Sequence, residues 1–105
     1  MTGININGSV QQKITTTGSS SYTVLSTDYI IYTNSQSNTV TINLPACSSN
    51  ANRVLTIKAN QCASTNSVTI ARNGSDTIEN TTSYVITTDY KTVTLISDGT
   101  SNWII

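Results

Sequence analysis

The chain has 105 residues, the length of a single domain, and its five basic and five acidic side chains give a formal net charge of zero at pH 7. This balance provides no basic patch for nucleic acid and no polybasic segment for a membrane surface. No apolar run approaches the roughly 18 residues that cross a bilayer, and residues 1–12 lack the pattern of a secretory signal peptide. We therefore expect neither nucleic-acid binding nor membrane insertion.

The side chains on which catalysis usually depends are scarce in this sequence. There is no histidine, and a nucleophilic serine would then need a lysine or an N-terminal amine as its base. No Ser-x-x-Lys motif occurs. We expect no catalytic residue, no cofactor-binding residue, no metal ligand and no enzyme activity.

Residues 1–20 are rich in Gly, Ser and Thr and carry few charges. Ile4, Ile6, Val10 and Ile14 alternate with polar residues, so this stretch could add a strand or pack along a partner. We interpret residues 1–20 as a flexible N-terminal arm or linker and residues 21–105 as one β-sandwich domain.

From residue 21 onward, apolar and polar residues alternate with the period of two that is typical of half-buried strands. Between 39 and 44, for example, Val40, Ile42 and Leu44 share one face. Turn signals, among them Asn73-Gly74, separate the strands at short intervals. The strands expected are 22–25, 28–33, 39–44, 53–58, 67–71, 77–79, 84–87, 91–97 and 102–105.

Many short strands with polar turns and no helical periodicity favour an all-β fold. We predict an antiparallel β-sandwich of the jelly-roll type that forms a trimer, with a trimeric β-prism as the second choice. The apolar content of 36% is low for a small domain. Burial of one face against copies of the chain would compensate for a thin core.

Cys47 and Cys62 are the only cysteines. We favour two reduced thiols; the alternative, a disulfide between them, would close a loop of about 15 residues and contribute about 3 kcal/mol. A metal site needs about four ligands, and only carboxylates could supplement the two thiols. We expect no metal and no catalytic role for either cysteine, and leave their redox state open.

Asp28 and Asp89 each precede a tyrosine at the start of an expected strand. A catalytic carboxylate pair would have to converge in a cleft, so the simpler interpretation is that each side chain caps its own turn. Asp76 and Asp98, beside glycine-containing turns, receive the same interpretation. Burial in the core is the expectation for the six aromatic residues, which are Tyr22, Tyr29, Tyr32, Tyr84, Tyr90 and Trp103.

Two Thr-Val-Thr motifs, at 39–41 and 92–94, resemble the hydroxyl arrays of ice-binding solenoids. They are not embedded in a fixed repeat, so we interpret them as ordinary solvated strand residues.

The last three residues, Trp103, Ile104 and Ile105, are all apolar. In a strand, Trp103 and Ile105 share one face and Ile104 takes the other, so both faces are apolar. The core of a single chain can bury only one face of this strand, and a neighbouring subunit is the natural partner to bury the other face. We predict a homotrimer with these three residues at its interface; cover by a loop of the same chain is the alternative.

An ordered set of short segments within residues 21–105 resembles a β-rich module of phage tail-fibre proteins and of giant-virus or virophage fibre-head proteins. The most specific landmarks are Leu44-Pro45-Ala46, Ser97-Asp98-Gly99-Thr100 and Trp103-Ile104-Ile105. The others are Tyr22-Thr23-Val24, Thr27-Asp28-Tyr29, Val40-Thr41-Ile42, Arg53 to Lys58, Val68-Thr69-Ile70, Asn73-Gly74, Thr77-Ile78 and Val93-Thr94-Leu95.

The resemblance implies a small trimeric all-β domain at or near the tip of a virion fibre. It implies a location on the virion surface and contacts with other virion proteins. The role would be structural support or attachment to a host-surface receptor, with a glycan as one such receptor. A purely structural capsid or fibre component, an ice-binding protein and a lectin-like adhesin domain remain as alternatives.

Overall fold

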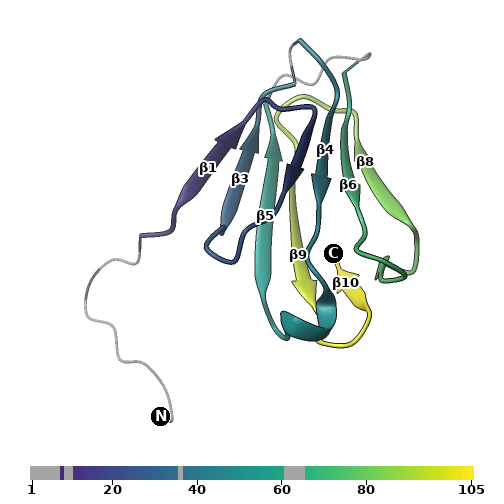
Figure 1. The fold of residues 1–105 in the computed structure, drawn as a ribbon. Coiled ribbons are helices and arrows are strands. Elements are labelled where there is room, and N and C mark those ends of the chain that lie inside the picture. The colour runs from purple at the N-terminus through teal and green to yellow at the C-terminus, as the bar shows by residue number, and fades with distance from the viewer. Residues whose placement is uncertain (1–7, 9–10, 36, 61–65) are drawn as a thin grey trace.

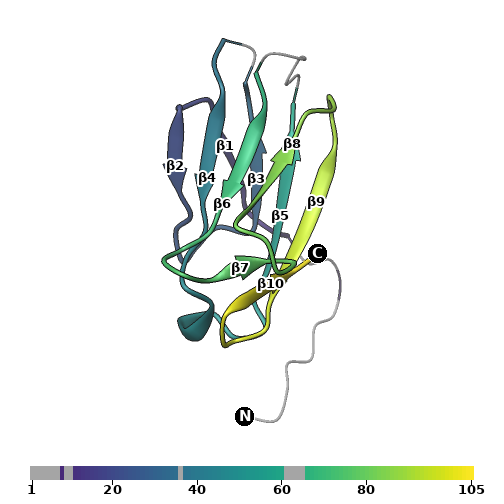
Figure 2. The same ribbon diagram turned by 90° about the vertical axis from the view of Figure 1, so that its right-hand side faces the viewer.

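The computed structural model describes residues 8, 11–35, 37–60 and 66–105, and these form two β-sheets packed face to face (Figures 1 and 2). Sheet A has the strand order β1-β3-β5-β9-β10-β7 and sheet B has the order β2-β4-β6-β8. The strands are β1 (Ile14–Thr17), β2 (Ser21–Thr23), β3 (Ile30–Thr33), β4 (Val40–Asn43), β5 (Val54–Ala59), β6 (Val68–Ala71), β7 (Thr77–Ile78), β8 (Ser83–Ile86), β9 (Thr92–Ser97) and β10 (Asn102–Ile104); a 3₁₀ turn, η1, spans Cys47–Ser49.

The first six strands follow a coiled path between the two sheets. The chain runs through β1, β3 and β5 in sheet A and visits β2, β4 and β6 in sheet B between them. Each strand therefore pairs in parallel with the strand two places further along the chain, as in β1–β3, β3–β5, β2–β4 and β4–β6. Three successive coils result: β1 with β2 is the first coil, β3 with β4 the second and β5 with β6 the third.

The expectation of an antiparallel sandwich is wrong in its strand directions, because both sheets are mixed. The strands of parallel sheets are usually buried on both faces, so each of them appears in the sequence as a continuous apolar run. Here each sheet has one solvated face, so its strands alternate like antiparallel ones; β9, for example, alternates exposed and buried residues throughout. The strand that visits the opposite sheet replaces the long crossover that parallel pairing normally requires.

Antiparallel strands close the other end of the coiled part. In sheet B, β8 pairs antiparallel with β6, and in sheet A, β9 pairs antiparallel with β5. The chain then turns into β10, which pairs antiparallel with β9 and parallel with β7. The first coil thus keeps two edge strands, β1 and β2, while the third coil is covered by β8 and β9.

The core lies between the sheets and is built from the inward side chains of nearly every strand. The largest fully buried side chains include Trp103, Leu55, Ile57 and Leu95. Each side chain of this size contributes about 1.5–3 kcal/mol when it leaves water. Among the described residues, the indole Nε1 of Trp103 has no hydrogen-bond partner, so this side chain acts as an apolar filler of the core.

Sheet A begins before residue 21, where the sequence placed the domain boundary. Ile14–Thr17 forms β1 and pairs with Ile30–Thr33, so this part of the expected arm belongs to the sheet. Residues 1–7, 9 and 10 lie outside the described part of the chain. Within the described residues, no helix has the length and hydropathy needed to span a bilayer.

Candidate functional site

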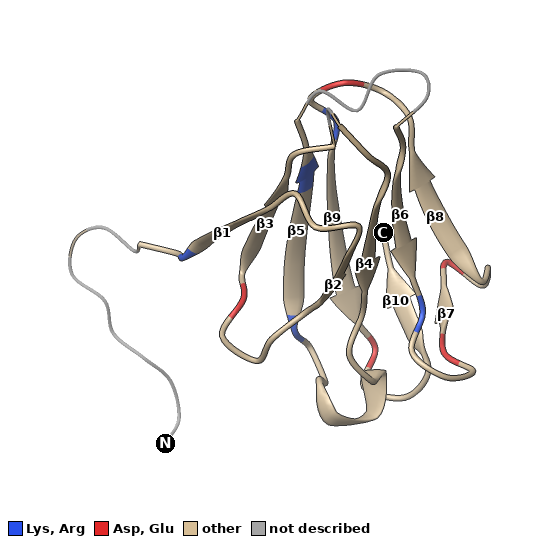
Figure 3. Ribbon diagram, turned by 45° about the horizontal axis from the view of Figure 1, so that its top comes forward, with Lys and Arg blue, Asp and Glu red and all other residues tan. Residues whose placement is uncertain are grey.

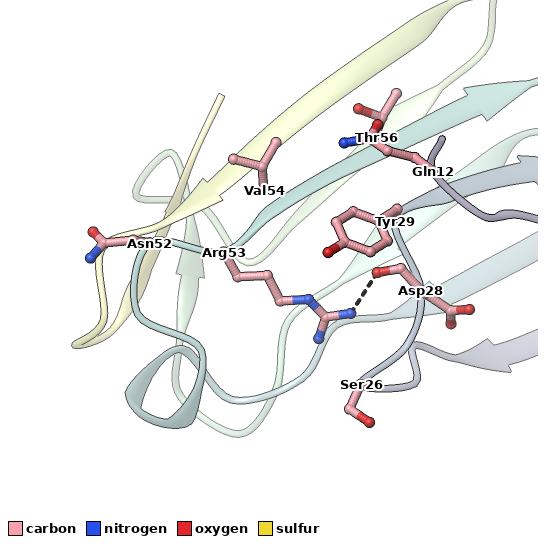
Figure 4. A pocket seen from close by; sticks show the side chains of 8 residues that line it. All are labelled: Gln12, Ser26, Asp28, Tyr29, Asn52, Arg53, Val54 and Thr56. Carbon is pink, nitrogen blue, oxygen red and sulfur yellow. Dashed lines mark hydrogen bonds between the residues drawn. The ribbon is translucent and has the colours of Figure 1, made fainter. Parts of the chain in front are cut away.

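A pocket of about 470 Å³ lies on sheet A beside the start of β5. Its lining comes from separate segments: Gln12 before β1, the loop between β2 and β3, the loop before β5, and β5 itself (Figure 4). The described residues that line it are Gln12, Ser26, Asp28, Tyr29, Asn52, Arg53, Val54 and Thr56. Hydroxyl, amide and guanidinium groups dominate this surface.

Arg53 ties the loops around the pocket together. Its guanidinium donates hydrogen bonds to the backbone oxygen of Asp28 at 2.8 Å (Figure 4), to the backbone oxygen of Leu25 at 2.7 Å and to Oδ1 of Asn50 at 3.0 Å. All three acceptors are uncharged, and all belong to loops that precede β3 or β5. Arg53 therefore holds one wall of the pocket in place.

The carboxylate of Asp28 holds a second wall from within the protein. Asp28 is only 2% exposed, and its carboxylate accepts hydrogen bonds from the Thr15 hydroxyl at 2.7 Å, the Tyr22 hydroxyl at 2.7 Å and the Leu25 amide at 2.8 Å. The Leu25 bond confirms the expected turn cap. The bonds to Thr15 and Tyr22 extend its role, because they join the turn to β1 and β2.

Asp28 remains a carboxylate well into the acid range. Burial raises its pKa, but the Leu25 amide, the two hydroxyl donors and the positive charge of Lys13 together outweigh burial, so the net pKa is lowered. Donors that stabilise the charged form act in this direction. The pKa of Tyr22 is raised by burial and by its contact with Asp28, so the phenol stays protonated as the donor.

The other carboxylates divide between turn capping and longer-range contacts. Asp98 caps its own turn as expected, accepting from the backbone amides of Thr100, Ser101 and Asn102, and these bonds lower its pKa. The capping expectation is wrong for Asp76, whose carboxylate accepts from the amide of Cys47 across the fold at 2.9 Å.

Asp28 and Asp89 occupy matching points of the fold but differ in burial. Each precedes a strand that enters sheet A from sheet B, β3 in one case and β9 in the other. Asp89 is exposed whereas Asp28 is buried.

Burial in the core was the wrong expectation for two of the tyrosines. Tyr29 and Tyr90, which follow the two aspartates, are each 52% exposed. Tyr29 lines the pocket, while Lys58 Nζ lies 6.0 Å from the ring centre of Tyr90. Trp103 is buried as expected, and Tyr22, Tyr32 and Tyr84 are half-buried.

Cys47 is a free thiol, fully buried in η1. Burial raises the pKa of the Cys47 thiol, and the nearby carboxylates of Asp76 and Asp98 raise it further. A hydrogen bond with Ser97 lowers the pKa but does not outweigh burial and the two carboxylates. A thiol in this environment is a poor nucleophile, since the thiolate is the reactive form. Cys62 lies outside the described residues. Within the described part of the chain, no group of three or more Cys, Asp or Glu side chains is placed to hold a metal ion.

Exposed apolar side chains form a row across the outer face of sheet A. Register places Val54 of β5 opposite Ile96 of β9, and Ile96 opposite Ile104 of β10. These three side chains are 47%, 43% and 44% exposed. We call them the apolar row. Ile105 is also exposed, whereas Trp103 is buried in the core between the sheets.

The two Thr-Val-Thr motifs lie in different sheets, the first at β4 in sheet B and the second on β9 in sheet A. They cannot form one hydroxyl array. Charged residues are likewise spread over separate loops and strands (Figure 3).

Sequence reasoning did not identify the pocket. No spacing connects Gln12 with Arg53, and the only local signal is the Asp28-Tyr29 pair at the start of β3. Comparison with models of known protein families, with curated proteins and with solved structures gives no match.

Proposed function

We propose that this chain is the head or attachment module of a virion fibre, a non-enzymatic homotrimer displayed on the surface of the particle. The observation that carries the proposal is the polarity of the coils. At one end the edge strands β1 and β2 pair in parallel with their neighbours, whereas at the other end β8 and β9 pair antiparallel with theirs and reverse the strand direction.

This polarity suits a terminal unit of a longer assembly. An edge strand presents backbone N–H and C=O groups that a further strand can pair with. A preceding shaft segment or another virion protein can extend both sheets at β1 and β2 in the parallel direction already used within the domain. At the other end the edge strands are β7 in sheet A and β8 in sheet B. There the antiparallel pairing of β9 with β5 and of β8 with β6 interrupts the parallel coil, so the coil is not continued.

The apolar row supports association of subunits. Contiguous exposed apolar patches mark interaction surfaces, and Val54, Ile96 and Ile104 are aligned on three neighbouring strands. We propose that a second subunit covers Ile96 and Ile104 of this row together with Ile105, with Val54 at the margin of the contact, and that three subunits close around a three-fold axis. Trp103 supports the interface from inside the subunit, because it fills the core beneath β10.

Immunogold electron microscopy tests the location. Antibodies against the chain should label the ends of fibres on purified particles from cells that carry the gene. The isolated chain should also compete with particles for attachment to host cells. Absence of the chain from particles would refute the proposal. Labelled fibres without competition would favour the purely structural alternative.

An aligned row of hydroxyl side chains favours the ice-binding alternative. The outer face of sheet B aligns Ser21, Thr41 and Thr69 on the parallel strands β2, β4 and β6, with Val85 next in the row on β8. Thermal hysteresis in dilute solution would select ice binding and contradict the attachment proposal; a lectin-like adhesin would bind glycans without being present on particles.

A further inference from the structure

The pocket beside β5 has the wrong chemistry for an apolar ligand. Ligand pockets usually have volumes of about 300–1,000 Å³ and are lined mainly by apolar side chains. This pocket, at about 470 Å³, is within that range, but among the described residues that line it only Val54 and the ring of Tyr29 offer a substantial apolar surface. A polar ligand with one apolar face fits such a lining.

The pocket is held in shape by groups that a ligand does not need to reorganise. Arg53 is fixed by three oxygen acceptors, and the carboxylate of Asp28 is fixed by three donors. A preorganised site loses less conformational entropy on binding than a mobile one.

The charges at the pocket favour a neutral ligand. The guanidinium of Arg53 already donates hydrogen bonds to three protein oxygens, while the buried carboxylate of Asp28 points away from Arg53 (Figure 4). An anionic ligand would have to compete with these three oxygens for the donors of Arg53. Gln12, Asn52 and Thr56 add uncharged donors and acceptors.

Tyr29 supplies the apolar face. Its side chain is 52% exposed at the pocket, and aromatic rings combine a large contact area with a polar hydroxyl. The C–H face of a pyranose ring can lie on such a ring while its hydroxyl groups bond to amides and hydroxyls at the sides. This combination is the chemistry that recognises a sugar.

We infer that the pocket binds one uncharged saccharide unit of a glycan, with Tyr29 as the stacking platform and Arg53, Asn52, Gln12 and Thr56 as hydrogen-bonding partners. The inference rests on the proposed attachment function and locates it on the molecule. It places the recognition site on sheet A, next to Val54 of the apolar row.

A glycan array followed by titration of the best neutral hit tests the inference with the full chain. Tyr29→Ala should weaken binding at least about tenfold, equivalent to about 1.4 kcal/mol. Tyr29→Phe, which keeps the ring, should stay within about threefold of the wild type. Tyr90→Ala is the matched control, since Tyr90 is equally exposed but lies outside the pocket lining, and it should leave the affinity unchanged.

Each failure has a distinct meaning. Unchanged glycan binding by Tyr29→Ala, or binding confined to acidic glycans, would overturn the inference while the attachment function stood. Competition with particles for host cells without any glycan binding would also overturn it and leave attachment in place. Absence of the chain from particles would remove the proposed function itself. Circular dichroism of each variant checks that the fold is retained.

Discussion

Replacement of Asp28 by asparagine should destabilise the protein although it changes few atoms. The buried carboxylate accepts three hydrogen bonds. Hydrogen bonds to a charged group contribute roughly 1.5–3 kcal/mol each and neutral ones roughly 0.5–1.5. With the asparagine oxygen facing Tyr22 and Leu25, those two bonds weaken by about 1 kcal/mol each, while the Thr15 hydroxyl turns to accept a weaker, neutral bond from the asparagine N–H.

We therefore expect Asp28→Asn to lower the free energy of unfolding by about 2–3 kcal/mol at pH 7, measured by urea denaturation. Asp28→Ala should cost more, about 4 kcal/mol, because all three donors lose their partner. Asp89→Asn is the comparison at the exposed counterpart position; because the interactions of an exposed carboxylate are weakened by solvent, it should cost no more than about 1 kcal/mol. An effect of Asp28→Asn as small as that of Asp89→Asn would refute the reasoning.

The pH dependence of this difference provides a second check. The pKa of Asp28 is lowered in the folded protein, so its stabilisation is complete above the unfolded-state value of about 3.9 and is lost as the pH falls through the lower folded value. The wild type should thus lose its advantage over Asp28→Asn below about pH 4. A difference that persists undiminished at about pH 2 would contradict the assigned network.

Two further changes test the loops and the core. Gly99→Ala should lower the free energy of unfolding by about 2–4 kcal/mol, because Gly99 has φ +80° and an added Cβ would lie 2.8 Å from Cβ of Ala51. Gly74→Ala is the control: Gly74 has φ +53°, but an added Cβ there meets no atom within 4 Å, so the cost should be only about 1 kcal/mol. Equal costs in urea denaturation would show that the close approach to Ala51 is unimportant. Cys47→Ser should lower the free energy of unfolding by about 1–3 kcal/mol, because it places a hydroxyl in a buried site. Glycan and host-cell binding should stay unchanged, and a loss of binding in a folded variant would give Cys47 a functional role.

The period-two pattern was sufficient to find the strands from residue 21 onward but not their directions. Alternation reports only that each strand has one buried face. The coils escaped detection because their lengths are unequal: Ile14 pairs with Ile30, but Ile30 pairs with Thr56. A repeat of constant length would have appeared as a sequence period.

The pocket could not be predicted for a related reason. Gln12, Tyr29 and Arg53 become neighbours because the parallel strands β1, β3 and β5 all begin at the same end of sheet A. Tyr29 and Tyr90 have similar local sequences, yet only Tyr29 lies at this end of the sheet. The exposure of Ile104, in contrast, follows directly from alternation once Trp103 faces the core.

Light scattering of the purified chain tests the central claim, the trimeric fibre head, most directly. We predict a particle three times the chain mass of 11.2 kDa, and a shift to monomer in the double variant Ile96→Thr/Ile104→Thr, which keeps β-branched side chains but removes apolar surface from the apolar row. Val85→Thr, at a residue 49% exposed on sheet B, should remain trimeric. A wild-type monomer at micromolar concentration, or a trimer unaffected by the double variant, would contradict the account.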